Sequence, residues 1–92
     1  MNKAYIISYD LSNPGQRYEE LLKKIKAYPK WARLGGSAYI IITNQNHVQV
    51  RDNLKVNLDS NDKLFVGTIK APAAWYNLGD EVSQWLNNNL SQ

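Results

Sequence analysis

Short runs of β-branched and aromatic residues recur along the chain and predict its strands. Residues 4–11 form the first of these runs, which indicates a buried strand. Residues 31–34 and 37–43 form two more, separated by two adjacent glycines that fit either a bent hairpin or one strand broken by a glycine bulge. Residues 63–69 follow a cluster of turn-forming residues and predict the last strand of the core.

Between and after these runs, apolar residues recur at intervals of three and four, the spacing of an amphipathic helix. The first such segment spans residues 14–28, where Asn13 would cap the helix and Pro14 would occupy its first position. A second spans residues 46–58, and a third spans residues 80–90 in a tail of different character. The apolar faces of the three helices consist, in order, of Tyr18, Leu21, Leu22, Ile25 and Tyr28; of Val50, Leu54 and Leu58; and of Val82, Trp85 and Leu86.

The order of these elements, β-α-β-β-α-β followed by a tail helix, predicts an α+β fold. We expect a ferredoxin-like βαββαβ sandwich, with a four-stranded antiparallel sheet and two helices on one face. Residues 1–72 would form this core, and residues 73–92 a C-terminal helical appendage packed on the core or on a dimer partner. Because two helices cover only one sheet face in so small a chain, we expect a homodimer.

Composition narrows the range of function classes. Ninety-two residues form a single domain, near the lower end of what can bury a working core. The chain contains no cysteine, which excludes a disulfide framework, a thiolate metal site and a cysteine nucleophile. Its longest apolar run, residues 38–42, is far shorter than the roughly 20 residues of a membrane-spanning helix. With no segment typical of a signal peptide, we expect a cytoplasmic protein without a membrane partner.

Charge adds a candidate binding surface. The net charge of +3 is mildly basic, which permits a nucleic-acid partner without requiring one. Five of the eleven basic residues fall within positions 23–33, which contain no acidic residue. These residues could contact a phosphate backbone, or they could form a solvated helix end whose lysines complement the helix dipole; both interpretations stay open. The five are Lys23, Lys24, Lys26, Lys30 and Arg33.

Asp10 is the strongest single candidate for a functional residue, because a carboxylate ends an otherwise apolar strand there. Its structural alternative is to cap the following helix or to stabilise the turn at Asn13 and Pro14. Asp59 and Asp62 flank another polar turn, where a cation site is the weaker alternative to simple turn formation.

The remaining candidate side chains favour structural roles. His47 is the only histidine, which excludes a pair of histidine metal ligands, and its place near the start of the second helix predicts solvent exposure. Four aromatic residues could stack on nucleic-acid bases, but such residues more often fill a core or a dimer interface. The four are Trp31, Trp75, Tyr76 and Trp85. All but Trp31 lie in the tail, which favours the structural role.

Four stretches of the sequence resemble a family of small ferredoxin-fold proteins. They are Tyr5-Ile6-Ile7-Ser8-Tyr9-Asp10-Leu11 with Asn13-Pro14-Gly15-Gln16; Ser37-Ala38-Tyr39-Ile40-Ile41; Arg51-Asp52 with Leu54; and Asp62-Lys63-Leu64-Phe65-Val66. Over nearly the whole chain, this layout is similar to the short bacterial proteins called SinR-like. Over the first strand and the strand that begins at Ser37, it also resembles the CRISPR-associated Cas-two proteins and the related virulence-associated D proteins.

This resemblance implies a homodimer with Asp10 of each subunit near the two-fold axis. In nuclease members of the family, that aspartate pair is taken to hold a magnesium ion for phosphodiester hydrolysis, and Mg²⁺ favours oxygen ligands together with water. Two functions stay open. The protein could be a nucleic-acid-binding dimer or Mg²⁺-dependent endonuclease on RNA or DNA, with Asp10 as its catalytic and metal-binding residue. Alternatively, it is a non-catalytic interaction protein, such as an antitoxin, immunity protein or regulator with a protein partner. The presence of only one candidate catalytic carboxylate per subunit, Asp10, slightly favours this alternative.

Overall fold

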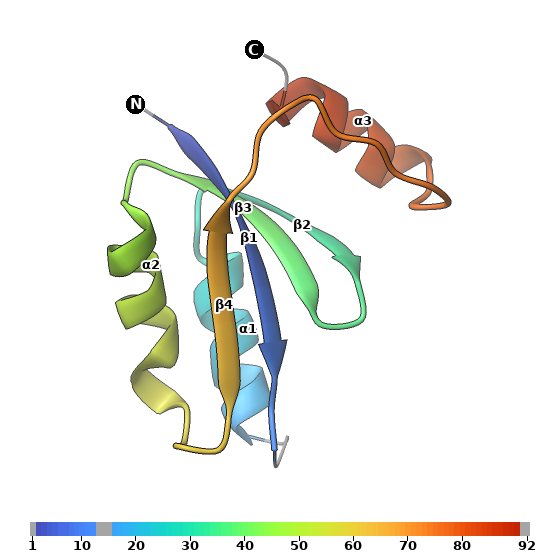
Figure 1. Ribbon diagram of the computed structural model, residues 1–92. Helices are drawn as coiled ribbons and strands as arrows, with labels where there is room; N and C mark the ends of the chain where they lie inside the picture. Colours follow the sequence, from blue (N-terminus) through green and yellow to red (C-terminus); the bar gives the residue numbers. More distant parts are fainter. Residues whose placement is uncertain (1, 13–15, 91–92) are drawn as a thin grey trace.

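A four-stranded antiparallel sheet lies at the centre of the fold (Figure 1). The computed structural model of the chain describes residues 2–12 and 16–90. The strands lie in the order β2-β3-β1-β4, and every neighbouring pair is antiparallel. Along the chain the elements are β1 (Lys3–Asp10), α1 (Gln16–Lys26), β2 (Lys30–Gly35), β3 (Ala38–Thr43), α2 (His47–Leu54), the 3₁₀ turn η1 (Lys55–Asn57), β4 (Lys63–Thr68) and α3 (Asp80–Leu90). This is the predicted ferredoxin-like βαββαβ arrangement with an additional helix.

The structure settles the two glycines between the strand pieces as the turn of a hairpin. Gly35 and Gly36 have φ angles of 138° and 49°, a region that residues with a Cβ rarely adopt. β2 and β3 pair on either side of them, with an irregularity in the register between Arg33 and Gly35. The hairpin tip is also tied to β1, because the backbone N–H of Tyr9 donates to the carbonyl oxygen of Ser37 at 3.2 Å.

Two helices are shorter than their patterns predict. α1 ends at Lys26 rather than residue 28, and the predicted start at Pro14 with its cap Asn13 lies outside the described residues. α2 ends at Leu54 because the backbone then tightens into η1. Its beginning is well defined: the Asn46 side chain accepts from the backbone N–H of Gln49, and the Gln49 side chain accepts from the backbone N–H of Asn46.

The inner face of the sheet, which we define as the face packed against α1 and α2, carries the main hydrophobic core (Figure 1). Alternate residues of a strand point to the same face, so Tyr5, Ile7 and Tyr9 of β1 all lie on this side and are buried. The apolar faces predicted for α1 and α2 meet them there. The other buried members of this core are Leu21, Ile25, Tyr28, Tyr39, Ile41, Val50 and Leu54.

The opposite, outer face is covered in part by α3 (Figure 1). Ile40 of β3 packs there with Leu86 and Leu90 of α3, and the predicted residues Val82 and Trp85 are partly buried against them. The rest of this face is open, and Phe65 of β4 is 62% exposed. Among the described helices, none is long and apolar enough to cross a membrane.

Candidate functional site

Asp10 lies at the last position of β1, on the outer face and exposed to solvent. Its Cα partner across the β1–β4 pair is Lys63, but the two side chains form no ion pair. Asp10 lines a shallow cavity of about 210 Å³ together with Tyr9, Tyr18 and Ser37. Within the described residues, no side chain or backbone group donates a hydrogen bond to its carboxylate.

The cavity beside Asp10 also contains tyrosine side chains. The Tyr9 hydroxyl is buried and has no hydrogen-bond partner in the described part of the chain. Burial raises the pKa of Tyr9 far above its ordinary value, and the neighbouring Tyr18 adds to this effect, so the phenol is neutral. The centroids of these two rings lie 6.1 Å apart. Asp10 is therefore the one acidic side chain among the described residues that line this cavity.

A metal ion would find few ligands here within a single chain. Across residues 2–12 and 16–90, no group of three or more His, Cys, Asp or Glu side chains comes together. Mg²⁺ can be held by one or two carboxylates with water and substrate phosphates. Asp10 therefore fits a magnesium site only where a second copy of the chain, or a phosphate, supplies the remaining oxygen ligands.

Asp62, which the sequence places in a simple turn, is the acidic side chain with the most hydrogen bonds. Its Oδ1 accepts from the backbone N–H and the hydroxyl of Ser12 at 2.9 and 3.0 Å. Its Oδ2 accepts from Arg17 Nε and from the backbone N–H of Asp59, both at 2.9 Å. The Asp59 backbone N–H, with the Ser12 and Arg17 donors, holds the pKa of Asp62 well below its usual range.

These contacts give Asp62 a structural role. Its side chain has no exposed surface, and it joins the segment after β1 to the start of α1 and to the turn before β4. The prediction of a turn, rather than a cation site, agrees with this geometry. Asp62 also accepts a hydrogen bond from the backbone N–H of Ser12. This donor is close in sequence to the turn that Asp10 was expected to stabilise in its structural alternative.

The structure separates the five basic residues that are close in sequence. Lys23, Lys24 and Lys26 lie in the last turn of α1, and Lys30 and Arg33 lie on β2. Lys30 is directed to the outer side, where its Nζ donates to Asn89 Oδ1 of α3 at 3.3 Å. Arg33 donates from Nη2 to the Gly36 carbonyl oxygen at 3.2 Å, at the hairpin tip. The run is therefore not one continuous patch.

Trp31 lies among the basic residues of the α1–β2 region. The Lys26 Nζ is 5.2 Å from the centroid of the Trp31 ring, a cation–π distance. The ring also lies 6.1 Å from that of Tyr39, and the residue remains 37% exposed. Arg33 is two residues further along the same strand, so its side chain leaves β2 on the same side as Trp31.

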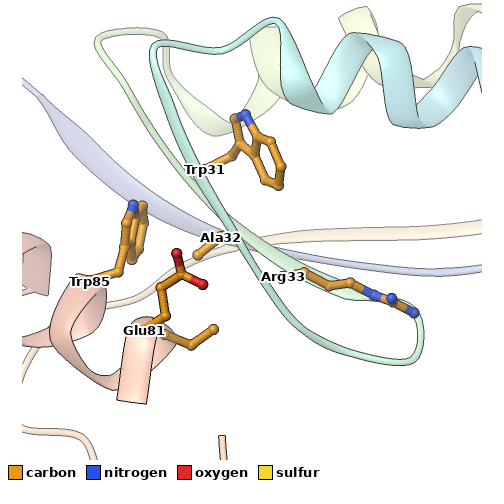
Figure 2. Close-up of a pocket in the computed structure, with 6 residues that line it drawn as sticks. Trp31, Ala32, Arg33, Glu81 and Trp85 are labelled. Atoms are coloured by element: carbon orange, nitrogen blue, oxygen red, sulfur yellow. The ribbon is translucent and has the colours of Figure 1, made fainter. Parts of the chain in front are cut away.

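Trp31 and Arg33 also line a second cavity, of about 280 Å³, at the free edge of the sheet (Figure 2). Its other walls are Ala32 of β2 and three residues of α3, among them Glu81 and Trp85. Figure 2 shows the Trp31 and Trp85 rings on different elements, with the Glu81 side chain beside Trp85. Sequence reasoning missed Glu81, although its spacing of four from Trp85 places both on one helix face.

The other expectations for single residues have mixed outcomes. His47 is exposed at the start of α2, as predicted. Trp75 and Trp85 are half-buried in the outer cluster, and Trp75 Nε1 donates to the Ser83 hydroxyl at 3.0 Å. This agrees with a sheet-covering role for the tail. Tyr76, by contrast, is 91% exposed.

Comparisons with known proteins support the fold. No family model and no curated protein matches this chain. Among solved structures, the chain is similar to a hypothetical protein, TT1823, from Thermus thermophilus, with a TM-score of 0.69 and 18% sequence identity. That likeness covers 84% of this chain and 93% of the Thermus chain. At this identity it shows a shared ferredoxin-like α+β fold, and the resemblance to Cas-two and SinR-like proteins stays a prediction.

Proposed function

We propose that this protein binds single-stranded nucleic acid in the cytoplasm, with Trp31 and its basic neighbours as the contact surface. The observation that carries the proposal is the partly exposed Trp31 ring with Lys26 over it and Arg33 next to it on the same side of β2. Single-strand binders combine such stacking rings with cations that follow the phosphate backbone. Lys23 and Lys24 share the last turn of α1 with Lys26 and extend the positive charge around this centre, whereas Lys30 points to the outer side.

The first experiment measures binding of a fluorescently labelled oligo(dT) by anisotropy at several salt concentrations. Trp31→Ala should weaken binding about tenfold, because stacking of one base contributes roughly 1–3 kcal/mol. Tyr76→Ala is the matched control, since Tyr76 is a large and even more exposed aromatic residue that does not line the cavity with Trp31. Equal binding by the parent and Trp31→Ala would contradict the proposal.

A charge test separates a phosphate contact from a solvated helix end. Lys26→Glu and Arg33→Glu should weaken binding and lower the slope of log affinity against log salt, since each lost phosphate contact removes about 0.7 from that slope for single strands. Lys55→Glu removes the same charge from the exposed C-terminal cap position of α2 and serves as the control. Equal effects of all three variants would leave only a nonspecific charge effect.

A second candidate is Mg²⁺-dependent phosphodiester hydrolysis by a homodimer that uses Asp10. What favours it is the exposed Asp10 carboxylate, which has no partner among the described residues and lies on the open part of the outer face. A second chain over that face would supply the second carboxylate that one chain lacks. In such a dimer Asp10 would bind the metal, and the ion would activate water for attack on phosphorus.

Asp10→Asn tests this second candidate. Asn keeps the shape of the side chain and removes its charge, so cleavage of single-stranded RNA or DNA by the parent with Mg²⁺ should disappear in the variant. Equal cleavage by both proteins would exclude Asp10 as the catalytic residue, and no cleavage by either would leave a non-catalytic binding protein. Binding of oligo(dT) by Asp10→Asn would be retained, because Asp10 does not line the Trp31 cavity.

A further inference from the structure

The cavity between β2 and α3 has the size and the chemistry of a site for one planar, nitrogen-rich ring. Its volume of about 280 Å³ is below the range typical of drug-sized ligands. Its two indole rings lie on opposite sides of β2: Trp31 leaves the strand on the inner side, and Trp85 of α3 lies on the outer side beside Glu81. The Trp85 ring favours stacking on a flat conjugated ring. Stacking alone, however, would not discriminate between bases.

Glu81 gives the cavity a hydrogen-bond acceptor. Its exposed carboxylate lines the same space as the two rings, and no hydrogen bond or ion pair engages it within the described residues. A carboxylate only accepts hydrogen bonds, so it favours a base edge that offers donors. Arg33 lines the opposite part of the wall in Figure 2, where a cation suits a phosphate rather than a base.

We propose that this cavity is a base-selective subsite that takes guanine, stacked on Trp85 and recognised by Glu81, with Trp31 at its rim on the other side of β2. Guanine presents two adjacent donors, its ring N–H and its exocyclic amino group, to the two oxygens of one carboxylate. Thymine and uracil present one donor between two carbonyl oxygens, which the carboxylate repels. The inference rests on the proposed nucleic-acid binding and adds the identity of the preferred base.

The test compares three labelled oligonucleotides that differ at one central position: dT, dG, or dI, which lacks the exocyclic amino group. The parent should bind the dG oligonucleotide about tenfold more tightly than the dT oligonucleotide, within the discrimination expected of a bidentate base contact. The dI oligonucleotide should lose most of this gain. Glu81→Gln should bind all three alike, because the amide neither accepts from both guanine donors nor repels the thymine carbonyl oxygens as the carboxylate does.

Asp80→Asn is the matched control, because Asp80 is also an acid in the first turn of α3 but does not line the cavity. It should keep the preference for dG. Equal affinities of the parent for dG and dT, or a preference that survives in Glu81→Gln, would overturn the guanine subsite while oligo(dT) binding still supports the proposed function.

The guanine subsite can also be tested if the proposed nucleic-acid binding fails. If no oligonucleotide binds, titration of the tryptophan fluorescence with GMP and UMP still tests the cavity alone. Quenching by GMP that exceeds quenching by UMP, and that disappears in Glu81→Gln, would support the subsite without the nucleic-acid surface. Equal quenching by GMP and UMP, or none, would refute both proposals.

Discussion

The inner and outer faces of the sheet differ in how completely helices cover them. On the inner face, Tyr5, Ile7 and Tyr9 of β1 are all buried beneath α1 and α2. On the outer face, the alternate residues of the same strand change from half-buried Ile6 near α3 to exposed Asp10 at the far end. One strand therefore has a fully closed side and a half-open side.

This difference separates the source of stability from the surfaces that are free for binding. Hydrophobic stabilisation grows with the apolar area removed from water, so the inner core should carry most of the folding free energy. The open end of the outer face and the free edge of β2 contribute less, and both candidate cavities lie there. Substitutions on the two faces should therefore differ in the property that they change.

The largest effect on stability is expected from the inner face. Leu54 of α2 is 1% exposed, and Leu54→Ala should lower the free energy of unfolding by about 3 kcal/mol, as is typical of buried leucines. Urea denaturation followed by circular dichroism measures the change. Val56→Ala, at a residue that is 65% exposed, should change stability by less than about 0.5 kcal/mol. Similar losses in the two variants would contradict the assigned core.

On the outer face, Leu86→Ala should destabilise the protein less, by about 2 kcal/mol, although Leu86 is only 2% exposed. The smaller loss is expected because the residues around it are mostly half-buried and can relax into the space. Hydrogen exchange should show faster opening of α3 with little change in β1. A loss as large as that of Leu54→Ala would mean that the two faces are equally important for stability.

Asp62 allows a test of stability that depends on pH. Asp62→Asn should lower the melting temperature less than Leu86→Ala does, by removing the charge that Ser12, Arg17 and Asp59 bind. Because folding lowers the pKa of Asp62 from its ordinary 3.8, its contribution is present above about pH 4 and is lost as the pH falls below that value.

The measurement is a series of thermal melts of the parent and Asp62→Asn between about pH 7 and pH 3. The difference in melting temperature should shrink toward the acid end, because below about pH 4 the unfolded chain binds a proton at Asp62 that the folded parent does not. Asp52→Asn is the control, since Asp52 forms only exposed pairs, with Arg51 and Lys55. A difference for Asp62→Asn that stays constant over this range would contradict the assigned role.

The smallest effect on folding is expected at the open end of the outer face. Phe65 is 62% exposed, so Phe65→Ser should change the free energy of unfolding of the single chain by less than about 0.5 kcal/mol. If the predicted homodimer covers this face, the same substitution should weaken it strongly. Light scattering at tens of micromolar separates the two results. A parent that is a monomer of 10.5 kDa would refute the dimer.

Much of the fold could be predicted because its elements depend on local patterns. Apolar residues spaced three and four positions apart predict α3 with the bounds that the structure has, Asp80–Leu90. The same spacing identifies Leu21 and Ile25 as core residues of α1. Alternation along β1 is equally local. The ends of α1 and α2 were less predictable, because the tightening of the backbone at Lys55 depends on how the chain turns toward β4.

The functional surfaces depend on which strands and helices meet, and only the tertiary structure decided that. The sequence by itself identified Asp10 and the basic run, but the direction of each strand residue separates Lys30 from Arg33. Glu81 and Trp31 are fifty positions apart and share a cavity because α3 packs beside the edge strand. Periodicity reports the side of an element that faces the core, whereas long-range packing determines which side chains from distant segments become neighbours.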